Sequence, residues 1–331
     1  MRRLKVAVTG TLGVLGRHLL SRLDAEDACR QLVLLDLVPP PHPPRKACFC
    51  RVDLTEPRSS QRIADALERE RVDVVVHLAF LQHPVRTAGY AHELEALGTQ
   101  HLLNALSRLA RGAAPVPLVV GSSTLVYGAR PENPAQLRED APLRGRPGYP
   151  LVGEKIAAER HVRAFQRASG TAVTILRMAP LLSPGVRTIV GRYLSLPAVP
   201  TLLGFNPMLQ TLAVADAVEA LGRALERAAD GGGRGALEVY NVCGSDVLPL
   251  HAAIRLCGRR SVPLLRFAAG AMVDALFQAG LAIAPSAHFD YLQYGCVADG
   301  ERAVAELGFV PRKSTRDCVN DLAHTLLRAA A

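Results

Sequence analysis

The sequence predicts a doubly wound α/β fold, in which a parallel sheet of the Rossmann type is followed by a smaller C-terminal substrate lobe. Short runs of continuous apolar residues recur along the first half with helical stretches between them, and a glycine-rich turn directly follows the first run. Strands that are apolar throughout, rather than alternating, are buried on both faces, as parallel sheets require. A chain of 331 residues, 49% hydrophobic and 21% charged, can bury such a core.

The predicted elements alternate up to about residue 178. The apolar runs read as strands are 4–8, 32–35, 72–78, 118–120 and 173–176. The stretches with helical spacing are 14–23, 60–70, 88–110 and 153–168. Beyond them the pattern mixes helices with one plausible strand near 237–242, which we expect to return to the main sheet. We therefore predict a Rossmann domain over 1–178 and a substrate lobe over 179–331.

Two apolar segments are not expected to span a membrane. Three glycines and two threonines interrupt residues 1–20, which rules against a secretory signal. The segment Val262–Ala284 contains Arg266, Asp274 and Gln278, and such groups are costly at the bilayer centre. We expect it to be one buried or interfacial helix, and we expect a cytoplasmic protein.

Charge and cysteine content argue against several functional classes for this protein. The net charge of +9 comes from arginines spread along the chain, without a basic run or a tryptophan for base stacking, so we predict no nucleic-acid partner. The seven cysteines are odd in number and form no C-x-x-C pair, which disfavours a disulfide scaffold and a zinc site. We predict no metal.

The glycine-rich turn predicts a phosphate-binding site. Thr9 to Gly16 reads T-G-T-L-G-V-L-G, follows a strand and opens a helix. Glycine is needed where backbone turns tightly or approaches a diphosphate, and a helix N-terminus offers free N–H groups to an anion. The residues predicted to bind a dinucleotide here are Thr9, Gly10, Leu12, Gly13, Val14 and Gly16.

Asp36, at the end of the second strand, follows Gly16 by 20 residues. A carboxylate there accepts hydrogen bonds from both ribose hydroxyls and repels a 2′-phosphate, so we predict NAD rather than NADP. The alternative is a solvated Asp36 with Arg45 close enough to serve a phosphate.

These residues resemble the extended short-chain dehydrogenase/reductase family, in its NAD-dependent epimerase/dehydratase branch, of which UDP-galactose 4-epimerase is a member. The resemblance runs almost end to end. It rests on the order of several short strings: the glycine turn, Asp36, Asp53-Leu54, His77-Leu78-Ala79, Ser122 to Gly128, Lys155 to Glu159, Leu176-Arg177, Gln210 to Asp216, Tyr240-Asn241-Val242 and Ala305 to Pro311.

The resemblance assigns further roles. It implies that Asp53 and Leu54 contact the adenine, that Ala79 lines the cofactor channel, and that Lys155 binds the nicotinamide ribose. It also implies that Ser123 hydrogen-bonds the substrate oxygen. The alternatives are a helix-capping Asp53, a Ser123 that satisfies a strand-end carbonyl and a solvated Lys155. Only four of the 39 basic residues are lysines, which favours a specific role for Lys155.

Relatives carry a reactive tyrosine in Y-x-x-x-K, one helical turn before the lysine, but this chain has Leu151 at that position. Leucine transfers no proton. A displaced donor is one explanation, with Tyr149, Glu154 and His83 as candidates; Tyr149 serves only if Gly148 to Pro150 is a loop folded over the site. A non-redox reaction, such as an elimination, cyclisation or isomerisation, is a second explanation. A catalytically silent NAD-binding protein is a third.

Two further departures concern the proton relay and the substrate, respectively. Glu95 occupies the position of an asparagine that supports a proton-relay water in relatives, and Met178-Ala179-Pro180 lacks the asparagine of sugar-nucleotide enzymes. Apolar segments of the C-terminal lobe favour a hydrophobic ligand, with a lobe core or dimer face as the alternative. We therefore predict an NAD-dependent oxidoreductase or epimerase-like enzyme on a small, apolar alcohol or ketone, with Ser123, Lys155 and Tyr149 catalytic. A homodimer through helices 93–109 and 154–167 is possible by the same analogy.

Overall fold

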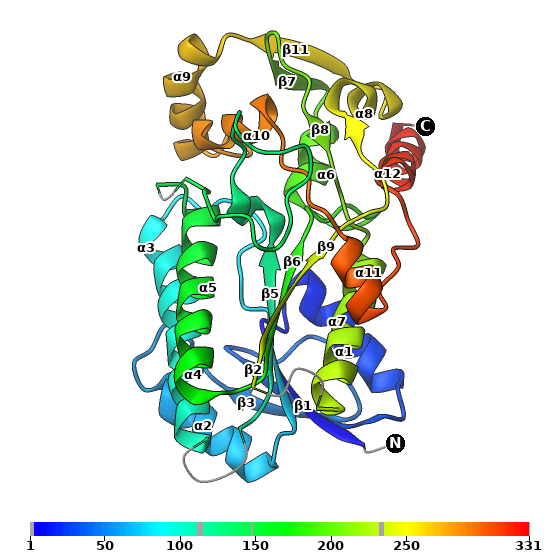
Figure 1. The fold of residues 1–331 in the computed structure, drawn as a ribbon. Coiled ribbons are helices and arrows are strands. Elements are labelled where there is room, and N and C mark those ends of the chain that lie inside the picture. Colours follow the sequence, from blue (N-terminus) through cyan, green and yellow to red (C-terminus); the bar gives the residue numbers. More distant parts are fainter. Residues whose placement is uncertain (1–2, 111–114, 147, 232–234, 331) are drawn as a thin grey trace.

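A seven-stranded parallel sheet forms the centre of the computed structural model, which describes residues 3–110, 115–146, 148–231 and 235–330. The strand order is β3-β2-β1-β4-β5-β6-β9 (Figure 1). The strands are β1 (Leu4–Thr9), β2 (Cys29–Asp36), β3 (Ala47–Arg51), β4 (Val74–His77), β5 (Leu118–Ser123), β6 (Val173–Met178) and β9 (Leu237–Val242). This arrangement confirms the predicted Rossmann-like α/β fold.

Helices cover both faces of the sheet (Figure 1). One face carries α2 (Ser59–Glu70), α3 (Ala88–Ala91), the π-helical turn η1 (His92–Leu97), α4 (Gly98–Leu109) and α5 (Pro150–Ser169). The other carries α1 (Val14–Ala25), α7 (Val214–Ala229) and α11 (Glu301–Leu307). Successive residues of β1 alternate between two buried clusters, since Val6 and Val8 pack on the α1 side and Ala7 on the α2 side. Burial of both faces explains why the strands are apolar throughout.

The chain returns to the sheet after residue 178. Strand β9 pairs with β6 in parallel, Ile175 facing Val239, and α7 packs against α1 beside it. Apolar residues of α7, among them Ala217 and Leu221, belong to the same core cluster as β1. The Rossmann layer is therefore completed by residues that lie within the predicted 179–331 lobe.

The remaining elements form a cap above the carboxyl ends of the strands (Figure 1). They are η2 (Thr124–Tyr127), α6 (Ile189–Leu194), β7 (Ala198–Leu202), β8 (Met208–Leu209), β10 (Leu248–Pro249), α8 (Leu250–Leu256), β11 (Arg260–Leu264), α9 (Arg266–Gln278), η3 (Ser286–His288), α10 (Phe289–Gln293) and α12 (Thr315–Ala330). Two small sheets, β10-β8 and β11-β7, hold the cap together.

The prediction of one helix over Val262–Ala284 is wrong. Val262 to Leu264 belong to β11, which pairs in parallel with β7, and the helix α9 begins only at Arg266. Pro263 explains the difference, because proline disfavours helical backbone in the residue before it. Among the described residues, no helix has the length and hydropathy needed to cross a bilayer.

Candidate functional site

The glycine turn packs tightly against the end of β4. Gly10 has φ +70°, and a Cβ there would lie 2.5 Å from the carbonyl carbon of Leu78 and 2.6 Å from the nitrogen of Ala79. A Cβ on Gly16 would lie 2.2 Å from the Gly10 oxygen. Gly13 is exposed and precedes α1, which starts without a side-chain cap. The helix N-terminus is therefore open to an anion at the carboxyl edge of the sheet.

Asp36 is tied to this turn. Its Oδ2 accepts hydrogen bonds from the Thr11 nitrogen and the Thr11 hydroxyl, both at 2.8 Å, and its Oδ1 accepts one from the Leu37 nitrogen at 2.8 Å. The carboxylate is thus fixed next to the phosphate-binding turn, and its Oδ1 retains lone-pair capacity for a ribose hydroxyl. Open turn, uncapped helix and fixed carboxylate together fit an adenine dinucleotide.

The other predicted nucleotide contacts differ in exposure. The Oδ1 of Asp53 accepts hydrogen bonds from the nitrogen and hydroxyl of Thr55, at 2.9 and 2.7 Å, and Asp53 lines a surface hollow together with Leu37. Leu54 is buried, and its carbonyl oxygen lies 2.8 Å from the Nδ1 of His101. Asp53 therefore stabilises the turn at Thr55 and does not cap the following helix α2, whose N-cap is Arg58 without a side-chain hydrogen bond.

Thr9 and Ala79 lie under the turn rather than in the open. The Thr9 hydroxyl is 2.7 Å from Nδ1 of His77, whose Nε2 is 2.9 Å from the hydroxyl of Thr99. Burial lowers the pKa of His77 to about 3, so the ring is neutral at physiological pH. This chain of hydrogen bonds locks β1, β4 and α4 beneath the glycine turn.

A cleft at the carboxyl ends of β4, β5 and β6 brings Ser123 and Lys155 together. Its further lining includes Leu15, Phe80, Gln82, Ser122, Leu151 and Met178. The Ser123 oxygen accepts a hydrogen bond from the Leu125 nitrogen at 3.3 Å, which leaves its proton available to a substrate oxygen. Leu151 lines the cleft where relatives carry their tyrosine.

Lys155 is held by a buried carboxylate. Its Nζ donates to Glu95 Oε1 at 2.9 Å and to the Leu81 carbonyl oxygen at 2.8 Å, and only 5% of the residue is exposed. Oε1 also accepts from the Leu81 nitrogen at 2.5 Å, whereas Oε2 is buried and has no hydrogen-bond partner among the described residues. Burial raises the pKa of Glu95 despite the neighbouring ammonium. An ammonium has three protons, so Lys155 keeps one for the cleft.

This pairing was missed in the sequence, although both residues were singled out. Glu95 lies in the π-helical turn η1, a geometry often found at functional sites. Two features of the sequence could have indicated this pair: Glu95 stands where relatives have an asparagine, and the chain has few lysines. A contact between two residues 60 positions apart in the sequence cannot be predicted from their spacing.

The structure directs Tyr149 away from Ser123 and Lys155. Tyr149 has extended backbone ahead of α5, so it lies in the loop that its proposed role required. Its hydroxyl, however, is 3.1 Å from His288 Nδ1, it is 1% exposed, and it is not among the cleft-lining residues. Burial raises the pKa of Tyr149 and lowers that of His288 to about 4. Glu154 and His83 do not line the cleft either, and Glu154 is bound to His92 at 2.8 Å.

A second buried ion pair lies one turn further along α5. Arg177 donates to both oxygens of Glu159, at 2.7 Å from Nη2, and also to the Tyr127 hydroxyl and the Glu139 carbonyl. Ser122 donates to Glu159 Oε1 at 2.6 Å. Each charged group of this pair is 1% exposed and multiply hydrogen-bonded. The pair joins α5 to β5 and β6 beneath the cleft.

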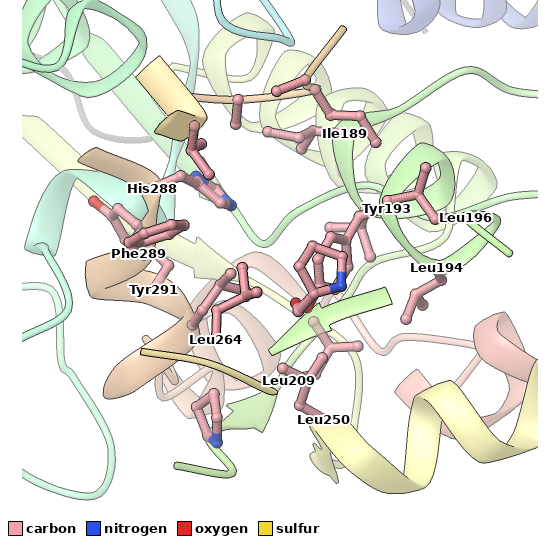
Figure 2. A pocket seen from close by; sticks show the side chains of 18 of the residues that line it. Ile189, Tyr193, Leu194, Leu196, Leu209, Leu250, Leu264, His288, Phe289 and Tyr291 are labelled. Carbon is pink, nitrogen blue, oxygen red and sulfur yellow. The ribbon is translucent and has the colours of Figure 1, made fainter. Parts of the chain in front are cut away.

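An apolar cavity of about 420 Å³ in the cap adjoins the cleft, since Leu125, Pro180 and Ile189 line both. Its described lining contains no aspartate, glutamate, lysine or arginine. Figure 2 shows aliphatic side chains of α6, β8 and β11 opposite His288, Phe289 and Tyr291. In the part of the chain that is described, no group of three or more possible metal ligands is found.

Comparisons with known proteins agree with this geometry. A model of the NAD dependent epimerase/dehydratase family matches residues 6–243. Uncharacterized proteins of Mycobacterium bovis and Mycobacterium tuberculosis are 35% identical over 328 residues, covering 96% of this chain and 82% of theirs. A 3-diazoavenalumate denitrifying reductase of a Streptomyces species is 28% identical over 187 residues, which is 55% of this chain and 58% of the reductase.

Solved structures share the fold at lower identity. The dTDP-glucose 4,6-dehydratase of Streptomyces venezuelae, with NAD bound, is 20% identical at a TM-score of 0.72, over 98% of this chain and 97% of that one. The UDP-glucuronic acid 4-epimerase of Bacillus cereus, in complex with NAD, is 19% identical at 0.69, over 99% and 100%. The predicted resemblance is confirmed.

Proposed function

Because the chain belongs to the NAD-dependent epimerase/dehydratase family, we propose that it is an oxidoreductase or epimerase-like enzyme for a small, apolar alcohol or ketone, with its proton donor displaced from the usual tyrosine position. One observation carries this proposal: the cleft that holds Ser123 and Lys155 adjoins a cavity whose described lining bears no charged side chain. Such walls favour an apolar ligand oriented by a few polar groups.

The residues around the turn suit the family's cofactor. The backbone of Gly10 to Gly16 and the N-terminus of α1 would hold the diphosphate, Asp36 the adenosine ribose, and Lys155 the nicotinamide ribose. Bound NAD supplies reversible hydride exchange with a carbinol or carbonyl carbon.

The protein's own part is to orient the substrate oxygen and move its proton. Ser123 donates a hydrogen bond to that oxygen. In the oxidative direction, Lys155 passes a proton to Glu95 Oε1, 2.9 Å away, and its Nζ takes the hydroxyl proton of the substrate. The pair ends as a carboxylic acid and an ammonium, and the reverse sequence protonates a ketone oxygen during reduction. A buried carboxyl group with a raised pKa suits this role.

Tyr149 is a second candidate donor. Its hydroxyl contacts His288, and the His288 ring lines the apolar cavity beside the cleft. A proton from Tyr149 reaches a substrate only through His288 or after a rotation of the phenol. Tyr149→Phe tests this route. Unchanged turnover would show that Tyr149 takes no part in the mechanism. A loss of turnover of about 10²-fold or more would show that the proton comes from Tyr149 and not from the Lys155–Glu95 pair.

Isotope transfer tests the proposed function directly. Purified protein is titrated with NAD and NADH, and protein loaded with NADH that carries deuterium at both C4 positions of the nicotinamide is then mixed with apolar ketones. Deuterium at the carbinol carbon of the product is the expected result. Tight cofactor binding without any label transfer across a panel of ketones would contradict the redox proposal.

A non-redox enzyme or a silent NAD-binding protein is the alternative function. Leu151 favours it, because the cleft has lost the phenol of the family while the features around Gly10 and Asp36 that suit the cofactor remain. Solvent deuterium exchange into a substrate without any change in cofactor absorbance would support the non-redox form.

A further inference from the structure

The cap presents an unusually apolar surface to solvent. Of the 16 large hydrophobic residues that are markedly exposed among the described residues, ten lie between 203 and 294. Phe267 is 86% exposed and Leu281 is 77% exposed. This concentration of exposed apolar side chains makes the cap the candidate interaction surface of the molecule.

Helix α9 carries much of this surface at the outer end of the cap (Figure 1). Its exposed residues include Phe267, Ala268, Ala271, Met272 and Ala275, which we call the α9 face. Spacings of three and four place the last four on one side of the helix. The acidic residue of the helix, Asp274, is engaged by the nitrogen and hydroxyl of Ser286, both at 2.7 Å. The α9 face is therefore apolar apart from Asp274, whose carboxylate is held by Ser286.

The same surface is continuous with the internal cavity. Val262, Met272 and Leu281 line the cavity and are 42%, 54% and 77% exposed. An apolar molecule leaving an apolar phase at the α9 face would enter the cavity without crossing water. A protein partner seated over these residues would instead cover the opening.

Positive charge lies at the start of β11, the strand that also carries the exposed, cavity-lining Val262. Arg255, Arg259 and Arg260 converge in a surface groove beside β11, and no acidic residue is among the described residues that line it. Between residues 247 and 285 the sequence has four arginines and one aspartate. Exposed apolar side chains rimmed by arginine are complementary to an anionic lipid surface.

We propose that the α9 face docks on the surface of an anionic lipid bilayer, and that the cavity takes up a lipid alcohol or ketone from it. The substrate part of this inference rests on the proposed function, while the docking part does not require catalysis.

The test is co-flotation of the full chain with vesicles of phosphatidylcholine, alone or mixed with phosphatidylglycerol. We expect binding to the mixed vesicles and at least tenfold weaker binding by Phe267→Ser/Leu281→Ser. Arg255→Gln/Arg259→Gln/Arg260→Gln should lose affinity by about fivefold for each arginine removed, an effect that added salt masks. Val310→Ser/Leu327→Ser, at residues each 64% exposed and outside α9 and β11, is the matched control and should bind like wild type.

Results of two kinds, from flotation and from sedimentation, overturn the docking proposal. One is a wild-type protein that floats with neither vesicle, or a Phe267→Ser/Leu281→Ser variant that floats as well as wild type. The other is a wild-type dimer in sedimentation that this variant converts to a monomer, since a second copy then covers the α9 face. NAD affinity, measured for every variant, reports an intact fold. Because docking is read without turnover, its failure is distinct from a failed isotope transfer.

Discussion

Two buried ion pairs lie one helical turn apart on α5 and differ in how completely they are satisfied. Arg177 and Glu159 bind each other through several hydrogen bonds and engage Ser122, Tyr127 and a backbone carbonyl. Lys155 and Glu95 share a single contact at 2.9 Å, and Glu95 Oε2 has no partner among the described residues. The first pair is enclosed, whereas the lysine of the second lines the cleft.

The difference indicates how one helix serves both structure and chemistry. Buried charges are costly unless they are hydrogen-bonded on all sides, so a fully engaged pair fixes neighbouring elements in place. A pair with spare capacity is kept where a proton or ligand is to be exchanged. We therefore expect the two pairs to respond oppositely to substitution, one in stability and the other in rate.

The largest effect is expected from Lys155→Met. Removing the group that exchanges the substrate proton should lower single-turnover transfer by about 10²–10⁴-fold, measured by the absorbance of the reduced cofactor. The variant also leaves Glu95 buried without its cation, so its thermal midpoint is measured in parallel. Lys155→Met/Glu95→Gln is the control that removes this uncompensated charge. Recovery of the rate in the double variant would show that Lys155 has only a structural role.

Arg177→Met should act on stability instead. It leaves Glu159 buried without a cation, which costs about 3–5 kcal/mol, measured by urea unfolding. Arg177→Met/Glu159→Leu removes both charges and should recover part of that loss. A single variant as stable as wild type would mean that the enclosed pair does not fix α5 to the sheet.

Gly13→Val should weaken NAD binding at least tenfold without unfolding the chain. A Cβ at Gly13 meets only the Gly10 oxygen, at 3.2 Å, so the protein tolerates it better than the diphosphate would. Calorimetric titration measures the affinity. Undiminished binding would refute the placement of the diphosphate.

Asp36→Ala, in the same assay, should relax the preference for NAD over NADP.

A further prediction concerns pH. Burial lowers the pKa of His77 to about 3 and that of His288 to about 4, from 6.5, so both are neutral in the fold and protonated on unfolding below pH 6.5. Their contribution to stability is present above pH 6.5 and is lost as the pH falls, at about 1.4 kcal/mol per pH unit for each histidine. Urea unfolding from pH 7 to 4.5 measures the slope. His288→Gln should reduce the slope of unfolding free energy against pH by the contribution of one histidine. An unchanged slope would mean that His288 is in contact with solvent.

Most of the nucleotide-binding half of the fold was predictable from the sequence. Continuous apolar runs located β1, β2, β4, β5 and β6, because strands buried on both faces have no polar alternation. The tight contacts of Gly10 and Gly16 explain why those glycines were informative. The third strand, Ala47–Arg51, was not among the predicted runs, since its pattern of half-buried residues is weak.

The reaction centre was predicted only in part. Ser123 and Lys155 meet in one cleft as expected, but the contact of Tyr149 with His288 depends on the packing of η3 against the start of α5, which no local pattern encodes. The Lys155–Glu95 contact likewise joins two helices far apart in sequence. In the cap, the segment Val262–Ala284 was interpreted as one helix, but it contains Pro263 and its first residues pair with β7 as strand β11.

The central claim is that Glu95 accepts a proton from Lys155, which allows Lys155 to take the hydroxyl proton of the substrate. Glu95→Gln tests it most directly, because glutamine still presents an oxygen to Lys155 and the Leu81 nitrogen but accepts no proton. At saturating NAD and a fixed apolar alcohol, we predict unchanged cofactor affinity and a single-turnover transfer rate lowered by about 10²-fold or more. A transfer rate equal to that of wild type would contradict the claim.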